Sequence, residues 1–184
     1  DAKNSHLYKE KNGLHHWRNT SSSGFANPSA SYVDGENPFK MGTARMARTV
    51  KQEDKRSEIA IIPQIKNEGE KAVYVCYQTL PESTDNALYT VYHKGQATTI
   101  SVNQRIGGGT WVYLGTFDFG KGCSENNCVV LNNLCTKDGM VTADAVRFGG
   151  GMGNIHRGGN ISGMPRALEG ARYAAQWYGA PQEV

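Results

Sequence analysis

The sequence has no long hydrophobic run and no block of a single charge. None of its apolar stretches approaches the roughly 20 residues that a membrane-spanning helix needs, so we expect no membrane span. The formal net charge is +3, and the basic run from Lys51 to Arg56 is interrupted by Glu53 and Asp54. Such a mixed run is typical of a solvated face, and no nucleic-acid-binding motif accompanies it, so we expect no nucleic-acid partner. No signal peptide stands at Asp1, and we expect a mature or trimmed product.

Strong motifs for cofactors, metals and hydrolysis are also missing. The glycine run after Phe148 lacks the Gly-Lys-Ser/Thr ending of a phosphate-binding loop, and the serines at 21–23 lack a G-x-S-x-G elbow. The C-x4-C-x6-C spacing of residues 123–135 lacks the paired knuckles of a zinc ribbon. His156 and Glu169 could imitate a metal-ligand pair, but a polar loop histidine near a helix carboxylate is the commoner situation. We expect no cofactor, no metal ligand and no catalytic residue that acts in this chain alone.

The four cysteines leave two alternatives open. Cys123 and Cys128 are close enough in sequence to close a disulfide loop, and free thiols are the other interpretation. Cys76 lies in an apolar run, where a cysteine is most often a small buried hydrophobic residue.

The composition favours an all-β chain with appendages. The 22 glycines and the apolar fraction of 38% suit many short strands joined by turns. Residues 1–45 show no sustained period and predict an irregular arm, whose aromatics, including Trp17 and Phe25, indicate that it packs on something. Residues 151–184 predict a Gly-rich linker and one helix between Pro165 and Gly179, with an apolar stripe that needs a partner surface.

Residues 46–150 contain the predicted core. In Lys71–Thr79 both alternating sets of side chains are apolar, as a strand covered on two sides requires. Lys94-Gly95 predicts a hairpin between two further strands. The predicted strands are Glu58–Ile62, Lys71–Thr79, Ala87–Lys94, Gln96–Asn103, Thr110–Phe119, Cys128–Leu134 and Met140–Phe148. This spacing predicts a mainly β protein, an antiparallel jelly-roll-like β-sandwich with an irregular N-terminal arm and one C-terminal helix.

Two strings in this core resemble one protein family. Residues 107–117 read GGGTWVYLGTF and residues 141–148 read VTADAVRF, with VCYQTLPES at 75–83 before them. Together they resemble the golvesin C-terminal domain of secreted bacterial proteins, over about residues 46–150. The resemblance implies a carbohydrate-binding-like β-sandwich without catalytic residues.

The flanks resemble the edges of a host domain. Residues 37–43 and 162–173, with Gln176-Trp177, are similar to segments of large gut-bacterial proteins described as xanthan lyases or N-acetylmuramoyl-L-alanine amidases. In that family the final helix carries Tyr-Trp-Leu, where this chain has Tyr173-Ala-Ala. The resemblance implies that residues 1–45 and 151–184 belong to a host domain, with Glu169 and Arg172 as contributors to its site. It also implies a secreted, periplasmic or cell-surface bacterial location, with the parent catalytic domain as partner.

Five side chains are candidates for a glycan or peptidoglycan site. Trp111 and Tyr113 point to one face of their strand, where open rings could stack on a sugar and closed rings would fill the sandwich. Tyr89, Tyr92 and His93 run into the predicted hairpin tip, where rings and donors could grip a glycan.

Asp144 is an acid in an otherwise apolar strand. If buried, it needs donors or a cation. We expect a structural role, in capping a turn or pairing with Arg147 or another base, because no dense Asp/Asn loop supplies the six or more oxygens that calcium takes.

Three functions remain open at the level of sequence. The first is a non-catalytic accessory module that binds glycan or cell wall for a secreted polysaccharide- or peptidoglycan-degrading protein. The second is a fragment of the catalytic region of a zinc amidase or polysaccharide lyase, and the third is a structural spacer.

Overall fold

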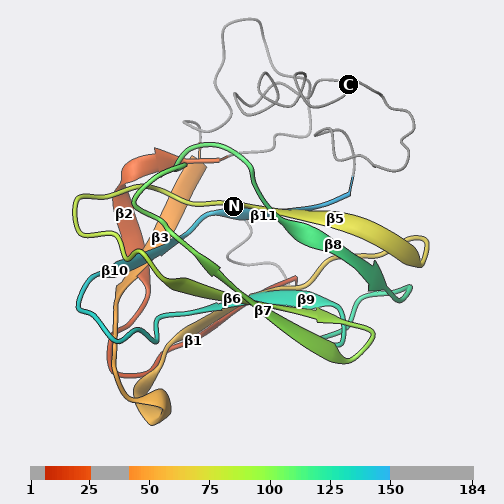
Figure 1. Ribbon diagram of the computed structural model, residues 1–184, viewed down its shortest axis with the longest axis horizontal. Coiled ribbons are helices and arrows are strands. Elements are labelled where there is room, and N and C mark those ends of the chain that lie inside the picture. The colour runs from red at the N-terminus through yellow and green to blue at the C-terminus, as the bar shows by residue number, and fades with distance from the viewer. Residues whose placement is uncertain (1–6, 26–41, 150–184) are drawn as a thin grey trace, which may run out of the picture.

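The described part of the protein is built from antiparallel β-strands. The computed structural model describes residues 7–25 and 42–149 (Figure 1). The strands are β1 (Tyr8–Lys11), β2 (Arg18–Gly24), β3 (Gly42–Arg48), β4 (Glu58–Ile61), β5 (Gly69–Cys76), β6 (Ala87–His93), β7 (Gln96–Val102), β8 (Val112–Phe119), β9 (Cys128–Asn132), β10 (Met140–Ala143) and β11 (Ala145–Phe148). One short 3-10 turn, η3 (Glu53–Lys55), accompanies them. The prediction of a mainly β, antiparallel protein is confirmed, while the predicted helix and linker of 151–184 lie outside the described residues.

The first sheet has five strands in the order β1-β4-β9-β6-β7. Its β6–β7 hairpin turns at Lys94 and Gly95, whose φ angles are 50° and 80°. A two-residue turn with positive φ at both positions matches the right-handed twist of the flanking strands, and glycine adopts it without steric cost. The hairpin predicted at Lys94-Gly95 is therefore confirmed.

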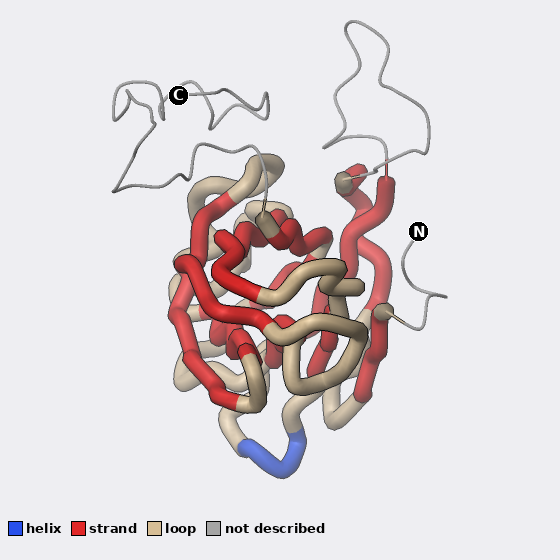
Figure 2. The backbone as a smooth tube through the Cα atoms, turned by 90° about the vertical axis from the view of Figure 1, so that its right-hand side faces the viewer, coloured by secondary structure: helices blue, strands red, loops and turns tan. Residues whose placement is uncertain are grey.

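The second layer is organised around one stretch, residues 140–148, that serves two sheets. Its first half, β10, pairs with β3 in the sheet β10-β3-β2, and its second half, β11, pairs with β5 in the sheet β11-β5-β8. Asp144 is the residue between the two halves. Figures 1 and 2 show the strands arranged around a shared interior, with η3 at one end.

The two layers enclose one main apolar core. Alternate side chains of both layers meet there, including Val91 and Leu131 from the first sheet and Val73, Val75 and Phe119 from the second. The other side chains of β5 are buried too, in a second cluster that contains Ala72, Tyr74 and Cys76. The sequence-based prediction that this strand is covered on both sides is thus confirmed.

A buried glutamine ties the layers together. The side-chain amide of Gln104 donates to the hydroxyl of Tyr89 at 3.0 Å and to the carbonyl of Thr142 at 2.8 Å. Its oxygen accepts the backbone N–H of Thr142 at 2.9 Å. Because its amide is fully hydrogen-bonded, Gln104 can be completely buried without the usual cost of a polar group.

The prediction of an irregular arm over residues 1–45 is wrong for residues 8–11, 18–24 and 42–45, which lie in β1, β2 and β3. There β1 pairs with β4, and β2 pairs with β3, and Trp17 between them is 4% exposed in the main core. The pattern was missed because β2 is an edge strand with mostly exposed polar side chains and an irregular register between Asn19 and Ser23. Backbone pairing, which leaves no trace in hydrophobic periodicity, determines its conformation.

Candidate functional site

The predicted aromatic face carries one buried and one exposed ring. Trp111 lies just before β8 and is 5% exposed, with Phe25 packed edge-on at a centroid distance of 4.9 Å. Tyr113 is 43% exposed and lies 5.4 Å from the ring of Tyr74, and its hydroxyl shares a hydrogen bond of 2.7 Å with that of Thr116. The indole of Trp111 therefore has no surface to offer a sugar, and of this predicted pair only Tyr113 reaches solvent.

The residues predicted at the hairpin tip point in different directions. Tyr89 is buried in the main core, and desolvation raises the pKa of its phenol far above the usual value. Tyr92, on the opposite side of β6, is half-buried and lies opposite Ala97 and Cys128. The structure therefore places Tyr89 in the interior and leaves Tyr92 partly exposed on the outward side of β6.

His93 is held against the second layer. Its ring lies 5.1 Å from the ring of Phe117, and its Nε2 shares a hydrogen bond of 2.9 Å with the hydroxyl of Thr98. The next residue, Lys94, forms an ion pair of 2.8 Å with Asp118 on β8. The hairpin tip is thus fastened to β8, and Tyr92 and His93 are not brought together on one surface.

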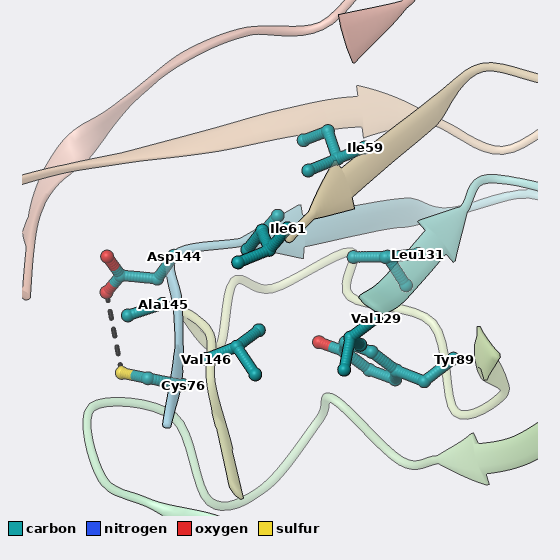
Figure 3. A pocket seen from close by; sticks show the side chains of 10 residues that line it. Ile59, Ile61, Cys76, Tyr89, Val129, Leu131, Asp144, Ala145 and Val146 are labelled. Atoms are coloured by element: carbon teal, nitrogen blue, oxygen red, sulfur yellow. Dashed lines mark hydrogen bonds between the residues drawn. The ribbon is translucent and has the colours of Figure 1, made fainter. Parts of the chain in front are cut away.

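Asp144 fastens the residue after β2 to β5, and Figure 3 shows its hydrogen bond to Cys76. Its carboxylate accepts the backbone N–H of Phe25 at 2.8 and 3.0 Å, the thiol of Cys76 at 3.4 Å and the amide of Gln78 at 3.4 Å. Burial raises its pKa to about 6, and the three donors oppose that rise. The expectation of a structural role fits these contacts, although the described partners are a backbone amide, a thiol and a side-chain amide, in place of Arg147.

The cavity beside Asp144 is too small for a ligand. It is lined mainly by apolar side chains, and its free volume of about 10 Å³ is the room of one water at most. Gly24 lies close by, and a Cβ there would meet an oxygen of Asp144 at 2.8 Å, so the carboxylate and the β2 backbone fill this corner.

The predicted disulfide does not form in the structure. All four cysteines are free, with Cys123 exposed and Cys76, Cys128 and Cys135 buried. Cys128 starts β9 and its thiol donates to the carbonyl of Glu125 at 3.3 Å, which draws the sulfur toward the Glu125 backbone. Of the two alternatives left open by the sequence, the structure has free thiols.

Residues 7–25 and 42–149 contain no group of three or more His, Cys, Asp and Glu side chains that could hold a metal ion. No helix among these residues is long and apolar enough to cross a membrane. Glu169 and Arg172, the expected contributors to a host site, lie outside the described residues.

Apart from Tyr92, the sequence analysis missed the outward side of the five-stranded sheet. We call this surface the open face: it comprises the side chains that point away from the main core, except Cys128, which lies opposite Tyr92 and is buried. They are Lys9, Lys11, Glu58, Ala60, Leu88, Thr90, Tyr92, Ala97, Thr99, Ser101, Val130 and Asn132. All are half-buried or exposed, whereas their strand neighbours Ile59, Tyr89, Val91 and Leu131 are buried. The alternation in 87–92 is the signal that could have identified it.

Comparison with known families decides the chain's affiliation. A family model for the Golvesin C-terminal domain matches residues 17–150, well over half of the chain. The chain belongs to this family. The golvesin C-terminal match begins at Trp17, so it includes β2 and β3 as well as the strands predicted from the sequence.

The golvesin C-terminal domain described here is also similar to parts of xanthan lyases. It is 31% identical over 90 residues to the protein named xanthan lyase of Bacillus sp. (strain GL1), a match over 49% of this chain and 10% of the relative. A solved Paenibacillus xanthan lyase shares the fold, with a TM-score of 0.60 and 20% identity over 80% of this chain and 12% of that one. The chain thus spans about a tenth of the length of these relatives.

Proposed function

We propose that this chain is a non-catalytic accessory module that binds glycan for a secreted, polysaccharide-active bacterial protein. The carrying observation is the 31% identity to a segment of a xanthan lyase that is only 10% of that protein's length. A short module of a large polysaccharide-active protein is suited to hold the substrate near a catalytic domain, because tethering raises the effective concentration of a partner. The parent catalytic domain is its proposed partner within the same protein.

The architecture supports this proposal. We infer that the two facing layers form a jelly-roll-like sandwich, an architecture also used by lectin domains. Such a domain offers broad, rigid sheet faces, which suit extended ligands better than a deep pocket does.

Retention on polysaccharide tests the proposal. The purified 184-residue chain would be run through native gels that contain xanthan, a neutral β-glucan or no polysaccharide, and pulled down with peptidoglycan sacculi. We expect retardation in at least one polysaccharide gel, with a dissociation constant in the micromolar to millimolar range, which corresponds to about 4 to 8 kcal/mol. No retention on any of these ligands would refute the proposal.

Activity assays on the same purified chain distinguish a binding module from a fragment of a catalytic region. Release of unsaturated sugars from xanthan, or of peptides from peptidoglycan, by this chain alone would show an enzyme fragment. Loss of that turnover in Glu169→Ala or Arg172→Ala would then assign the activity to the C-terminal segment.

A further inference from the structure

The registers of the five-stranded sheet align the open face into rows. Adjacent strands lie side by side without register shifts across this sheet, so residues opposite one another form lines perpendicular to the strands. One row is Lys9, Ala60, Val130, Thr90 and Thr99, and the next is Lys11, Glu58, Asn132, Leu88 and Ser101. A third, shorter row contains Tyr92 between Cys128 and Ala97. With strands about 4.8 Å apart, each full row is roughly 19 Å long.

The row that begins at Lys9 lies between the other two, and we call it the middle row. Apart from Lys9, its side chains are shorter than the largest side chains of the two flanking rows. Beyond Lys9 it contains only small or β-branched side chains, ending in Thr90 and Thr99. Larger side chains stand beside it: Leu88 in one flanking row and Tyr92 in the other. A thin chain laid along the middle row would therefore touch four strands and have an aromatic ring at one side.

The open face supplies hydrogen-bonding groups without strong charge. The hydroxyls of Thr90 and Thr99 lie 3.0 Å apart, so one of them can donate outward while the other accepts. Asn132 accepts the backbone N–H of Leu134 at 2.9 Å through its oxygen, which leaves the orientation of its amide group fixed. Charged side chains stand only toward the β1 edge, where Lys9 pairs with Glu125 and Glu58 pairs with Arg56.

This chemistry selects among classes of partner. A protein interface needs large anchors such as Trp, Tyr and Arg at its centre, and the centre of the open face is Val130 and Thr90. A nucleic acid needs a row of unpaired basic side chains, whereas the open face has two lysines at its β1 edge, of which Lys9 is ion-paired. Ring hydroxyls and the apolar faces of sugars match hydroxyl, amide and single aromatic groups on a flat floor.

We propose that the open face is the glycan-binding surface of this chain, and that an extended polysaccharide strand lies across β4, β9, β6 and β7 along the middle row. This inference rests on the proposed function and assigns it a place. It moves the site away from Tyr113, the exposed aromatic on the other layer. Because the floor is uncharged, contact is made by hydrogen bonds and packing, and binding persists at high salt.

A steric block on each layer tests the assignment. Ala60→Arg places a long side chain in the middle row, at the β4 end of the proposed path beside Val130. Thr116→Arg places the same side chain on the exposed outer side of β8. A second variant, Thr90→Val with Thr99→Val, removes both hydroxyls and keeps the β-branched shape. Each protein would be titrated with the polysaccharide that retards the wild type, at low and at high salt, after its thermal melt has shown that it is folded.

We expect Ala60→Arg to weaken binding at least about tenfold, the double Thr→Val variant to weaken it several-fold, and Thr116→Arg to bind like the wild type. Should Ala60→Arg not fold, the double variant carries the test. If the open-face variants bind the polysaccharide as tightly as the wild type and Thr116→Arg does not bind it, this inference is overturned. The proposed function would then still stand. A wild type that binds no polysaccharide would overturn the proposed function itself, and the inference with it.

Discussion

The outward sides of the two layers differ although both come from regularly alternating strands. On the β11-β5-β8 sheet the outward side chains Tyr74 and Trp111 are 1% and 5% exposed. On the five-stranded sheet the outward Thr90 and Val130 are half-buried, and neither core cluster of residues 7–25 and 42–149 includes them. The alternation of side chains along a strand therefore tells which residues lie on the same side of the sheet. Whether that side is buried depends on residues distant in sequence, such as Phe25.

Phe25, which covers Trp111 on the outward side of the second layer, is held by a hydrogen bond as well as by packing. Asp144 accepts the N–H of Phe25, and the ring of Phe25 then packs against Trp111. In the part of the chain that the structure describes, no comparable carboxylate anchors a cover over the open face, and the side chains in the middle of that face are smaller and more polar. The predictions below test this contrast, beginning with the largest expected effect.

Thiol reactivity should differ most strongly. Cys76 is buried on the outward side of the β11-β5-β8 sheet, whereas Cys123 is exposed. Desolvation is the main cause of the raised pKa of the Cys76 thiol, which keeps that thiol protonated. Since a buried thiol reacts only after the native structure opens, we expect native Cys76 to react with iodoacetamide at least about a thousandfold more slowly than Cys123. Mass-spectrometric mapping over time measures both rates, and comparable rates would show that this side is not closed.

Removing the buried indole should strongly destabilise the fold. Trp111→Ala leaves a cavity next to Phe25 and Tyr74, and such truncations cost about 3–5 kcal/mol. The matched control Tyr113→Ala removes an exposed ring from the same side and should cost less than about 1 kcal/mol. Urea unfolding of both variants gives the two values, and equal values would contradict the difference in burial.

The buried carboxyl should make stability depend on pH. The folded-state pKa of Asp144 is raised to about 6 from 3.8, so the protonated form favours folding and its contribution is lost as pH rises through that window. The shift corresponds to about 3 kcal/mol. We expect the wild type to lose stability relative to Asp144→Asn between pH 4 and about 7. If the unfolding free energies of the wild type and of Asp144→Asn change in the same way with pH across this range, the prediction is refuted.

Changes on the open face should hardly affect stability. Thr90→Val with Thr99→Val replaces exposed hydroxyls on paired strands by a residue of equal β preference, so we expect a change within about 0.5 kcal/mol. Thermal melts measure it. A loss above about 2 kcal/mol would mean that the hydroxyl pair supports the sheet and would remove these residues as clean probes of binding.

The parts of the fold with a strong local pattern could be predicted. The two apolar sets of residues 71–79 predicted burial on both sides of β5, and Lys94-Gly95 predicted its hairpin, because each depends on neighbouring residues alone. The strands β1, β2 and β3 were not predicted. The first two are polar edge strands, which are specified by their partners, and β3 lies between β10 and β2.

The candidate site was harder to predict for a physical reason. Aromatic residues drew attention to Trp111 and Tyr89, yet large rings contribute the most when buried, and both lie in the interior. The small residues of the open face gave a weaker signal, which becomes visible only when the strand registers align Ala60, Val130 and Thr90 in one row.

The shared strand at residues 140–148 determines when this chain can fold during synthesis. It supplies the partner of β3, about 95 positions earlier, and of β5, about 70 positions earlier, and β9 likewise stands between β4 and β6. A nascent chain that ends before Cys128 lacks β9, which joins β4 to β6 in the first sheet. It also lacks β10 and β11, which connect the two sheets of the second layer. Folding therefore begins only when nearly the whole module has left the ribosome, which makes early truncation products targets for proteolysis.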